Sequence, residues 1–388
     1  MILCIYGTTG ELIKIAPVLR RLADGGYGLI TATTAQQVEQ IPALLESLGL
    51  PQPDLWLGHG SHGRDLDRIT QVPGWAGGVM TRFMRLRRSL RRRLVDGPGK
   101  PLVLVHGDTM TTVLGAMMGH LLRIPVAHVE AGLRSFDLLH PFPEEMNRRI
   151  TSVLAGLLYA PGAWAASNLR RGVIVDTGSN TIRDSLAMSF DQPPPIEVEG
   201  EFGLVSLHRF ELLNNRDLLM KTLDLLADES HRTQLLFVDH PVTVAALRQH
   251  RLDQRITGSA IRRIDRMKFL DFVALLRLSR FIFTDSGGNQ EETYYLDIPC
   301  LVHRKRTERR EGIGQNVVLS GYDLTVARDF LADPARHRRT DMLPATSPSD
   351  VIVSDLVERG YAVEVAKATR EATRPSSRSY RSSTDGHR

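Results

Sequence analysis

Cysteine is almost absent from this chain, whose 388 residues include only Cys4 and Cys300. Both lie inside apolar runs, and two cysteines provide neither a disulfide framework nor a zinc-binding cluster. We interpret them as core residues of a protein from a reducing compartment. The sequence also has neither the glycine fingerprint of a dinucleotide-binding turn nor a cluster of metal ligands, so we predict no cofactor and no metal.

Long apolar runs and a large excess of charge of one sign are also missing. No stretch of about eighteen apolar residues occurs, so we predict no membrane span. Lys and Arg total 49 against 44 Asp and Glu. This excess suits an anionic small substrate and does not indicate nucleic-acid binding. Met1 leads directly into an apolar strand pattern rather than a signal peptide, so we expect a cytoplasmic location.

Short apolar runs alternate with helical patterns along most of the chain, which is typical of parallel α/β domains. We predict an α/β fold with two Rossmann-like, doubly wound domains that face a central cleft, an N-terminal domain over 1–170 and a C-terminal domain over 171–349. A helix over 350–373 is expected to return to the N-terminal domain, and the segment 374–388 to be disordered. The main predicted strands are Ile2–Tyr6, Tyr27–Thr33, Leu102–Val105, Ile124–Val129, Phe202–Leu207, Gln234–Val238, Phe281–Thr284 and Pro299–Val302.

Acidic side chains follow two neighbouring predicted strands in the first half. Asp108 comes after the run Leu102–Val105, and Glu130 comes after the run Ile124–Val129. In an open parallel sheet, ligands bind outside the carboxyl ends of the strands, so both carboxylates should face one crevice. Glu144 opens the next predicted helix and adds a third carboxylate. Together they favour an acid/base site that removes a weakly acidic proton.

Each of these residues also has a simpler interpretation. Asp108 could cap the helix that follows it. Glu144 with Arg148, and Glu145 with Arg149, are spaced as ion pairs on one face of an exposed helix. Taken singly, these structural roles are as plausible as catalysis, and the convergence of three carboxylates is what favours the acid/base site.

The second half has its own polar strand ends. His208 follows one strand, and the sequence Asp-Ser-Gly-Gly at 285–288 follows another and opens a helix. Backbone N–H groups at such a helix start can hold phosphate, and Glu292 could accept ribose hydroxyls. The alternative is a plain strand–turn–helix in which Glu291 and Glu292 are solvated. His240, which stands alone before a proline, is interpreted as structural or peripheral.

In their order and spacing, several motifs resemble the non-hydrolysing UDP-N-acetylglucosamine 2-epimerases. The matching segments are GTTGELIKIAPV, LVHGDTMTT, HVEAGLRSFDLLHPFPEEMNRR, LHRFE, TDSGGNQEE and RKRTERREG, which extend from Gly7 to about Gly321. The resemblance implies the GT-B architecture, UDP bound in the C-terminal domain, and a homodimer. It also implies a UDP-sugar as substrate and no metal or NAD.

The resemblance assigns roles to matched positions. Asp108, Glu130, Glu144 and His208 correspond to the family's catalytic residues. The positions implied to bind the substrate are Lys14, Arg148, Arg209, Phe272, Ser286, Gly287, Gly288, Glu292 and Arg304. The implied chemistry is removal of the C2 proton of the sugar, departure of UDP from C1, and re-addition of UDP with protonation from the other face.

The chain also departs from the family pattern. Thr9 stands where the first turn usually has arginine, Phe210 where a second arginine is usual, and Arg310 where proline is usual. The effector segment survives only in part, as Gln36 and Gln37. These departures bear on the preference for UDP-N-acetylglucosamine and on allosteric activation. The alternatives to a non-hydrolysing epimerase are a hydrolysing epimerase, a glycosyltransferase of the same architecture, and a non-catalytic nucleotide-sugar-binding protein.

Overall fold

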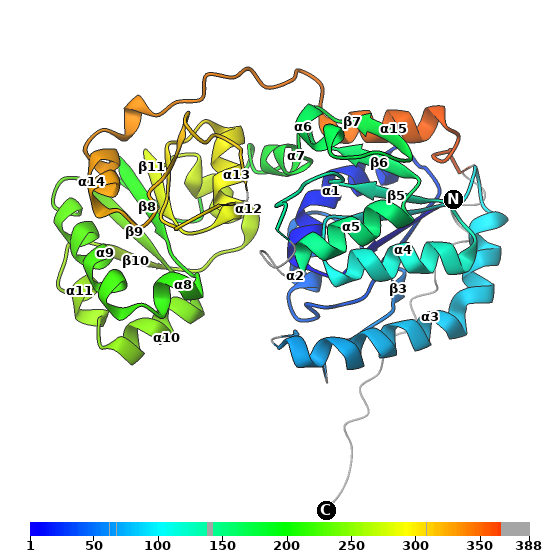
Figure 1. The fold of residues 1–388 in the computed structure, drawn as a ribbon, viewed down its shortest axis with the longest axis horizontal. Helices are drawn as coiled ribbons and strands as arrows, with labels where there is room; N and C mark the ends of the chain where they lie inside the picture. Colours follow the sequence, from blue (N-terminus) through cyan, green and yellow to red (C-terminus); the bar gives the residue numbers. More distant parts are fainter. Residues whose placement is uncertain (62, 67, 138–142, 308, 366–388) are drawn as a thin grey trace, which may run out of the picture.

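The computed structural model describes residues 1–61, 63–66, 68–137, 143–307 and 309–365. Its described residues form two parallel sheets, each covered by helices on both faces, and the two halves face each other (Figure 1). This arrangement confirms the predicted α/β class with two Rossmann-like domains. Within the described part of the chain, no helix is both long and apolar enough to cross a membrane.

The first sheet has seven strands in the order β3-β2-β1-β4-β5-β6-β7. Every paired strand is parallel, and the order reverses between β1 and β4. Its elements are β1 (Ile2–Tyr6), α1 (Thr9–Asp24), β2 (Leu29–Thr33), α2 (Ile41–Ser47), β3 (Leu55–Trp56), η1 (Ile69–Gln71), α3 (Val72–Val95), β4 (Leu102–His106), α4 (Met110–Leu122), β5 (Val126–Val129), α5 (Glu144–Leu154), β6 (Leu157–Ala160), α6 (Ala163–Ser167) and β7 (Val173–Asp176).

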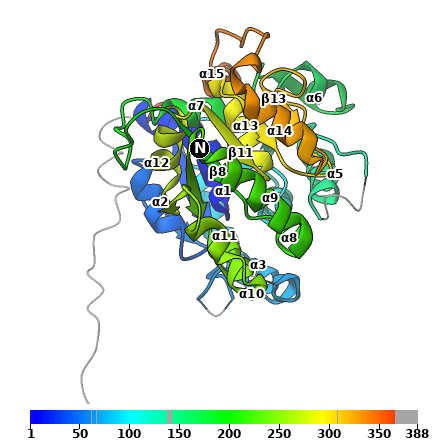
Figure 2. The same cartoon turned by 90° about the vertical axis from the view of Figure 1, so that its left-hand side faces the viewer.

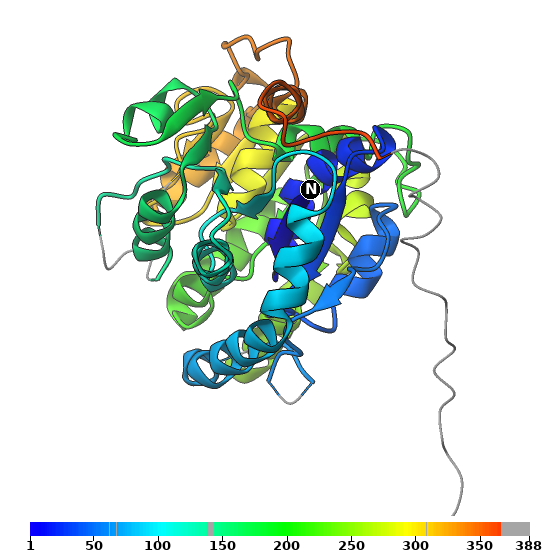
Figure 3. The ribbon, with the colours of Figure 1, turned by 90° about the vertical axis from the view of Figure 1, so that its right-hand side faces the viewer.

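The second sheet repeats this topology with six strands in the order β10-β9-β8-β11-β12-β13. Figure 2 views the molecule from the side of this second domain, and Figure 3 from the side of the first. Its elements, with the helices that join and close the domains, are α7 (Ile182–Ala187), β8 (Phe202–Ser206), α8 (Phe210–Leu213), α9 (Arg216–Glu229), β9 (Gln234–Asp239), α10 (Pro241–His250), α11 (Asp253–Thr257), β10 (Arg262–Asp265), α12 (Phe269–Leu276), β11 (Phe281–Thr284), α13 (Gly287–Leu296), β12 (Cys300–Val302), β13 (Val317–Leu319), α14 (Leu324–Ala332), η2 (Pro334–Arg336) and α15 (Pro348–Glu358).

Local sequence explains how the central strands and helices form. All residues of β1 are buried because helices cover both faces of the sheet. The helix α1 begins with a capping box, in which the Thr8 side chain accepts the N–H of Glu11 and the Glu11 carboxylate accepts the N–H of Thr8. Glu11 is 3% exposed and also accepts hydrogen bonds from the hydroxyls of Thr109 and Thr112. This carboxylate therefore joins the turns after β1 and β4, at the point where the strand order reverses.

Three details differ from the sequence-based expectations. The strand β7 pairs with β6, so the first sheet continues past residue 170, the expected end of the first domain. The final helix, expected over 350–373, ends at Glu358, because the backbone of Gly360 turns into the left-handed region with φ 74°. The short edge strands β3, β10 and β13 were not expected, since their few residues show no long apolar run. The segment 374–388 lies outside the described residues.

The chain crosses between the two sheets twice. After β7 it passes through α7 into the second domain, and after η2 it returns over residues 337–347 to α15, as the orange-to-red trace of Figure 1 shows. Ile352 and Leu356 of α15 pack in the same core cluster as Leu12 and Ile15 of α1. A smaller apolar cluster joins Ile182 and Leu186 of α7 to α12. These contacts place the carboxyl ends of both sheets at one junction.

Candidate active site

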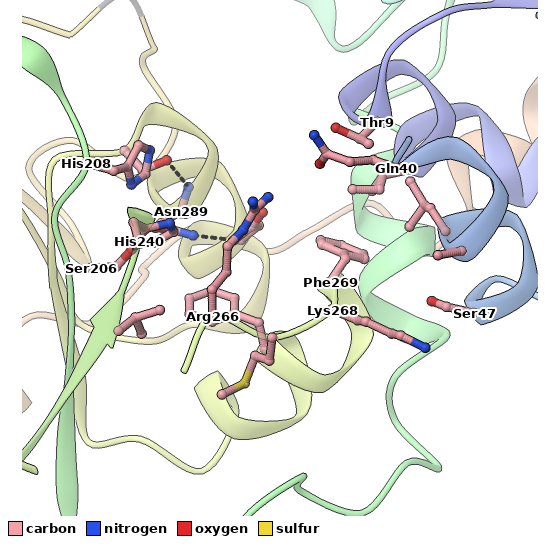
Figure 4. Close-up of a pocket in the computed structure, with 18 of the residues that line it drawn as sticks. Thr9, Gln40, Ser47, Ser206, His208, His240, Arg266, Lys268, Phe269 and Asn289 are labelled. Atoms are coloured by element: carbon pink, nitrogen blue, oxygen red, sulfur yellow. Dashed lines mark hydrogen bonds between the residues drawn. The ribbon is translucent and has the colours of Figure 1, made fainter. Parts of the chain in front are cut away.

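A cavity of about 540 Å³ lies at the junction, where the strand order of each sheet reverses. In Figure 4 the side chains His208 and His240 lie on one side of it, and Thr9 and Gln40 lie on the other. The lining residues come from both domains: Thr9, Ile13, Glu39, Gln40, Ala43, Leu44, Ser47, Ser206, His208, Val238, His240, Arg266, Met267, Lys268, Phe269, Phe272, Ser286, Asn289 and Glu292. The position agrees with the rule that ligands bind at such switch points.

The start of α13 forms one wall of this cavity. Ser286 caps the helix by accepting the N–H of Asn289. A Cβ on Gly288 would lie 3.5 Å from the Ser286 hydroxyl and 3.9 Å from Glu292 Oε1, so Gly288 lies between these two side chains. Asn289 Nδ2 donates to Glu292 Oε2 at 2.8 Å, and burial raises the pKa of Glu292. The N–H groups of a first helical turn have no partner within the helix, which makes this wall suited to an anion.

Two histidines stand beside this wall. Asp285 accepts the backbone N–H groups of His208 and Arg209, and the rings of His208 and His240 are 4.6 Å apart. Burial, together with the charges of Arg209, Arg266 and Arg304, lowers the pKa of His208 to about 4. The ring is therefore neutral at neutral pH.

His240, interpreted from the sequence as structural or peripheral, lines the cavity. Burial, the neighbouring His208 and Arg266 lower the pKa of His240 to about 4 as well. It follows the end of β9 just as His208 follows the end of β8. This shared position at a strand end was the signal that could have identified it.

Behind the cavity, Glu130 forms the centre of a buried polar cluster. Its Oε1 lies 2.5 Å from Lys14 Nζ and accepts a hydrogen bond from Asn180 Nδ2 at 2.8 Å. Its Oε2 lies 3.6 Å from His106 Nε2. Burial acts to raise the pKa of Glu130, but Lys14, His106 and Arg309 outweigh it and hold that pKa below its ordinary range. The carboxylate is therefore ionised at neutral pH.

The backbone of Glu130 is in the left-handed region, with φ 68°. Non-glycine residues adopt this region at a cost of about 1–3 kcal/mol and keep it only where the surroundings fix it. Here Oε1 of Glu130 contacts Lys14 Nζ and Asn180 Nδ2, and Oε2 lies 3.6 Å from the His106 ring. The conformation directs the side chain away from the end of β5 and toward the junction.

Asp108 forms the neighbouring part of the cluster. The Arg148 guanidinium approaches Asp108 Oδ2 at 2.7 and 2.9 Å. The cap of α4 is Thr109, whose side chain accepts the N–H of Thr112, so Asp108 does not serve as the cap. Arg148 thus pairs with Asp108, 40 residues away in the chain.

The two adjacent glutamates at the start of α5, Glu144 and Glu145, have different surroundings. Glu145 is fully buried and pairs with Arg149 at 2.9 Å, as the helical spacing predicts. Within the described residues, no hydrogen-bond partner is found for Glu144 Oε2. Residues 138–142, which precede this helix, lie outside the described part of the chain. Glu144 is thus a half-buried residue whose Oε2 atom is itself buried, one helical turn before Arg148 on α5.

The predicted site residues therefore fall into two adjoining groups. His208, Phe272, Ser286 and Glu292 line the cavity. The other group consists of two ion pairs, buried Lys14–Glu130 and Arg148–Asp108, whose aspartate is partly exposed. The groups meet at α13, because Glu292 faces the cavity and Glu291 reaches Lys14 at 3.3 Å. Sequence reasoning missed Glu291, which is 1% exposed rather than solvated. No group of three or more potential metal ligands occurs in the described part of the chain.

Comparison with known proteins gives a consistent result. The profile of the UDP-N-acetylglucosamine 2-epimerase family matches residues 83–326. The UDP-N-acetylglucosamine 2-epimerase of Methanococcus maripaludis is 31% identical over 339 residues, 82% of this chain and 87% of that protein. The enzyme of the same name from Bacillus subtilis is 30% identical over 373 residues, 89% of this chain and 90% of that protein.

Solved structures agree with the sequence relatives. One is the Methanocaldococcus jannaschii UDP-GlcNAc 2-epimerase in complex with UDP-GlcNAc and UDP, which is 28% identical with a TM-score of 0.71. The match covers 92% of this chain and 99% of that one. The Neisseria meningitidis UDP-GlcNAc 2-epimerase bound to UDP-GlcNAc has 27% identity and a TM-score of 0.72, and the match covers 92% and 99% of the two chains.

Replacing Glu130 by Gln should lower the free energy of unfolding at neutral pH. The loss should be smaller than the roughly 3–5 kcal/mol expected when a buried pair loses one partner, because Lys14 keeps Glu291. The folded-state pKa of Glu130 lies below the unfolded value of about 4.3, since Lys14 and its neighbours outweigh burial. The carboxylate therefore stabilises the fold above that pH, and its contribution is lost as the pH falls through lower values.

Urea unfolding of wild type and Glu130→Gln over a range of pH measures this contribution. The difference between them should be largest above about pH 5 and should shrink below about pH 4. Glu358→Gln, at an exposed position of α15, is the matched control. A difference that does not change with pH would contradict the assigned ion pair.

Proposed function

This chain belongs to the UDP-N-acetylglucosamine 2-epimerase family, and we propose that it interconverts UDP-N-acetylglucosamine and UDP-N-acetylmannosamine without hydrolysing them. One observation supports this proposal above the others. A buried cluster of carboxylates, including ionised Glu130, adjoins a cavity whose wall is a helix start suited to a diphosphate. The reaction needs both parts next to each other.

The cavity supplies binding groups for the nucleotide. Ser286, Gly287 and Gly288 at the start of α13 would hold the diphosphate, and Glu292 would accept the ribose hydroxyls. Phe272 of α12 lines the same cavity and offers an apolar face to the uracil ring. Arg209 and Arg304, whose charges act on His208, would add positive charge near the diphosphate.

The buried cluster supplies groups for the proton transfers. A carboxylate among Asp108, Glu130 and Glu144 would remove the proton at C2 of the sugar, and the C1–oxygen bond to UDP would break to give a 2-acetamidoglucal and UDP. Re-addition of UDP to C1, with protonation of C2 from the opposite face, gives the epimer. Because the C2 proton is only weakly acidic, its removal needs a positioned general base. Neutral His208 lies where it could interact with the departing diphosphate.

The non-hydrolysing outcome is supported by sequence rather than by geometry. The segment Pro141–Glu145 matches the proline- and glutamate-containing motif by which this subgroup is distinguished, although residues 141 and 142 lie outside the described part of the chain. We extend the proposal to a homodimer, as the family resemblance implies, and to a location in the cytoplasm. An acceptor requirement would instead favour the glycosyltransferase alternative.

Incubation of the purified protein with UDP-N-acetylglucosamine should give UDP-N-acetylmannosamine and no free sugar, as measured by NMR. Asp108→Asn keeps the shape of the side chain but removes its charge, and should slow the reaction by about 10²–10⁴-fold. Asp96→Asn, at the exposed end of α3, is the control and should not change the rate. Release of free sugar and UDP would establish the hydrolysing alternative, and sugar transfer to an added acceptor would establish a transferase.

Replacing Ser286 or Glu292 by Ala should weaken UDP binding and leave the fold intact. Both side chains line the cavity at the start of α13, and loss of a hydrogen bond to a charged group costs about 1.5–3 kcal/mol. Titration calorimetry with UDP measures the effect, and Ser167→Ala on the surface of the first domain is the control. Unchanged affinity in both variants would show that UDP binds elsewhere.

Thr9→Arg restores the arginine that the family usually has in the first turn. It tests whether Thr9 merely removes a contact to the ligand. Thr9 lines the cavity, and its N–H and hydroxyl both donate to Gln37 Oε1, at 2.7 and 2.9 Å. A guanidinium here would reach an anionic ligand and should tighten binding of UDP-N-acetylglucosamine by roughly tenfold or more. Calorimetry that shows no gain, or a loss, would mean that the Thr9–Gln37 contact belongs to a pocket rebuilt for another ligand.

A further inference from the structure

Two adjacent glutamates of α13 have different surroundings. Glu292 lines the cavity, whereas Glu291 is 1% exposed and faces the first domain. Glu291 Oε2 lies 2.5 Å from Arg309 Nη1 and 3.3 Å from Lys14 Nζ. The helix that carries the proposed phosphate site therefore also carries a buried carboxylate aimed away from that site.

Lys14 lies between carboxylates of the two domains. Its Nζ is 2.5 Å from Glu130, at the end of β5 in the first domain, and 3.3 Å from Glu291 in the second. Two cations, Lys14 and Arg309, thus face two carboxylates in a buried site. Burial raises the pKa of Glu291 to about 7, although Arg309 and Lys14 act to lower it. A carboxylate so placed depends on these two cations, so the position of each side chain depends on the others.

A second connection runs from the same face of α13. Tyr295, one helical turn after Glu291, accepts the backbone N–H of Asn180 at 2.9 Å. Asn180 Nδ2 in turn donates to Glu130 Oε1 at 2.8 Å. Two independent chains of contacts, through Lys14 and through Asn180, therefore link α13 to one oxygen of Glu130.

The segment that carries Arg309 is itself fixed to the first domain. The guanidinium of Arg310, which replaces the proline usual in the family, lies 4.5 Å from the ring centroid of Trp164 in α6. This cation–π contact crosses the same junction. It gives a structural reason for this departure and holds Arg309 beside Glu291.

We propose that Glu291 is a positioning residue, which acts through Lys14 to set the place of the catalytic carboxylate Glu130 when a nucleotide binds at the start of α13. Tyr295 acts in the same way through Asn180. The inference rests on the proposed epimerase function. The left-handed backbone of Glu130 needs support from its surroundings, and α13 supplies it from the domain that holds the nucleotide. Binding and proton transfer are thereby coupled through one helix.

Matched substitutions of the two neighbouring glutamates test this role. Glu291→Gln should lower kcat by about tenfold or more, as expected for a lost charge-assisted contact, and change UDP affinity less than about twofold. Glu292→Gln should mainly weaken UDP binding. If Glu291→Gln weakens UDP binding as Glu292→Gln does and leaves kcat unchanged, Glu291 belongs to the nucleotide site and the proposal fails.

A double-substitution cycle tests whether Glu291 acts through Lys14. The variant Lys14→Gln with Glu291→Gln should lose no more kcat than Lys14→Gln alone, because the path is already broken. Additive losses would overturn the proposal. Tyr295→Phe removes only the hydroxyl that receives the Asn180 N–H, and it should also lower kcat without changing UDP affinity. This variant provides the test if Glu291→Gln does not fold, and an unchanged kcat would then refute the coupling through α13.

Hydrogen exchange provides a readout that does not depend on turnover. Addition of UDP to the wild-type protein should slow amide exchange in the segment 129–132, which contains Glu130, and Glu291→Gln should abolish this protection although UDP still binds. Equal protection in both proteins would overturn the positioning role. A wild-type protein that binds UDP and shows this protection, but forms no epimer, would instead refute the proposed reaction and leave the coupling established.

Discussion

The ion pair between Lys14 and Glu130 is the interaction on which the arrangement of the site depends. It joins α1 to the end of β5, and Glu291 extends it into the second domain. Buried charges at a domain junction are stable only when each has its partner, so they fix how the domains meet more strictly than apolar packing does. The small apolar cluster around Ile182 and Val273 adds contact area at the same junction. Because apolar contacts are not directional, this cluster does little to fix the orientation of one domain relative to the other.

The same constraint fits the proposed division of the chemistry between two domains. The proposed nucleotide site uses the N–H groups of a helix start, which α13 has in the second domain. The proposed proton transfer uses carboxylates that follow strands β4 and β5 of the first domain. Because Glu291 and Glu292 are adjacent on α13, one rigid helix contacts both parts. A displacement of this helix would therefore change the contacts of the proposed ligand site and of Glu130 together.

The fold and several site residues could be predicted from the sequence, because the carboxyl ends of parallel strands lie at one edge of a sheet, where ligands bind. Asp108, Glu130, His208 and Ser286 were identified on that basis, and the two-domain α/β fold followed from the alternation of apolar runs and helical patterns. Which partner each charge would take could not be predicted. Arg148 pairs with Asp108 rather than with Glu144, and Glu291 is buried by the opposite domain, since both outcomes depend on contacts between distant parts of the chain. The edge strand β10, which reads Arg-Arg-Ile-Asp, has a single apolar residue, Ile264.

If a carboxylate of the site removes the proton at C2 of a UDP-sugar, as we propose, the hydrogen at C2 must be exchanged during turnover. The most direct measurement is turnover in heavy water, followed by NMR of the product. We predict that each molecule of epimer carries deuterium at C2, because the proton removed by the carboxylate exchanges with solvent before C2 is protonated from the other face. Epimer that retains its original hydrogen at C2 would contradict proton removal at C2 and place the chemistry at another carbon.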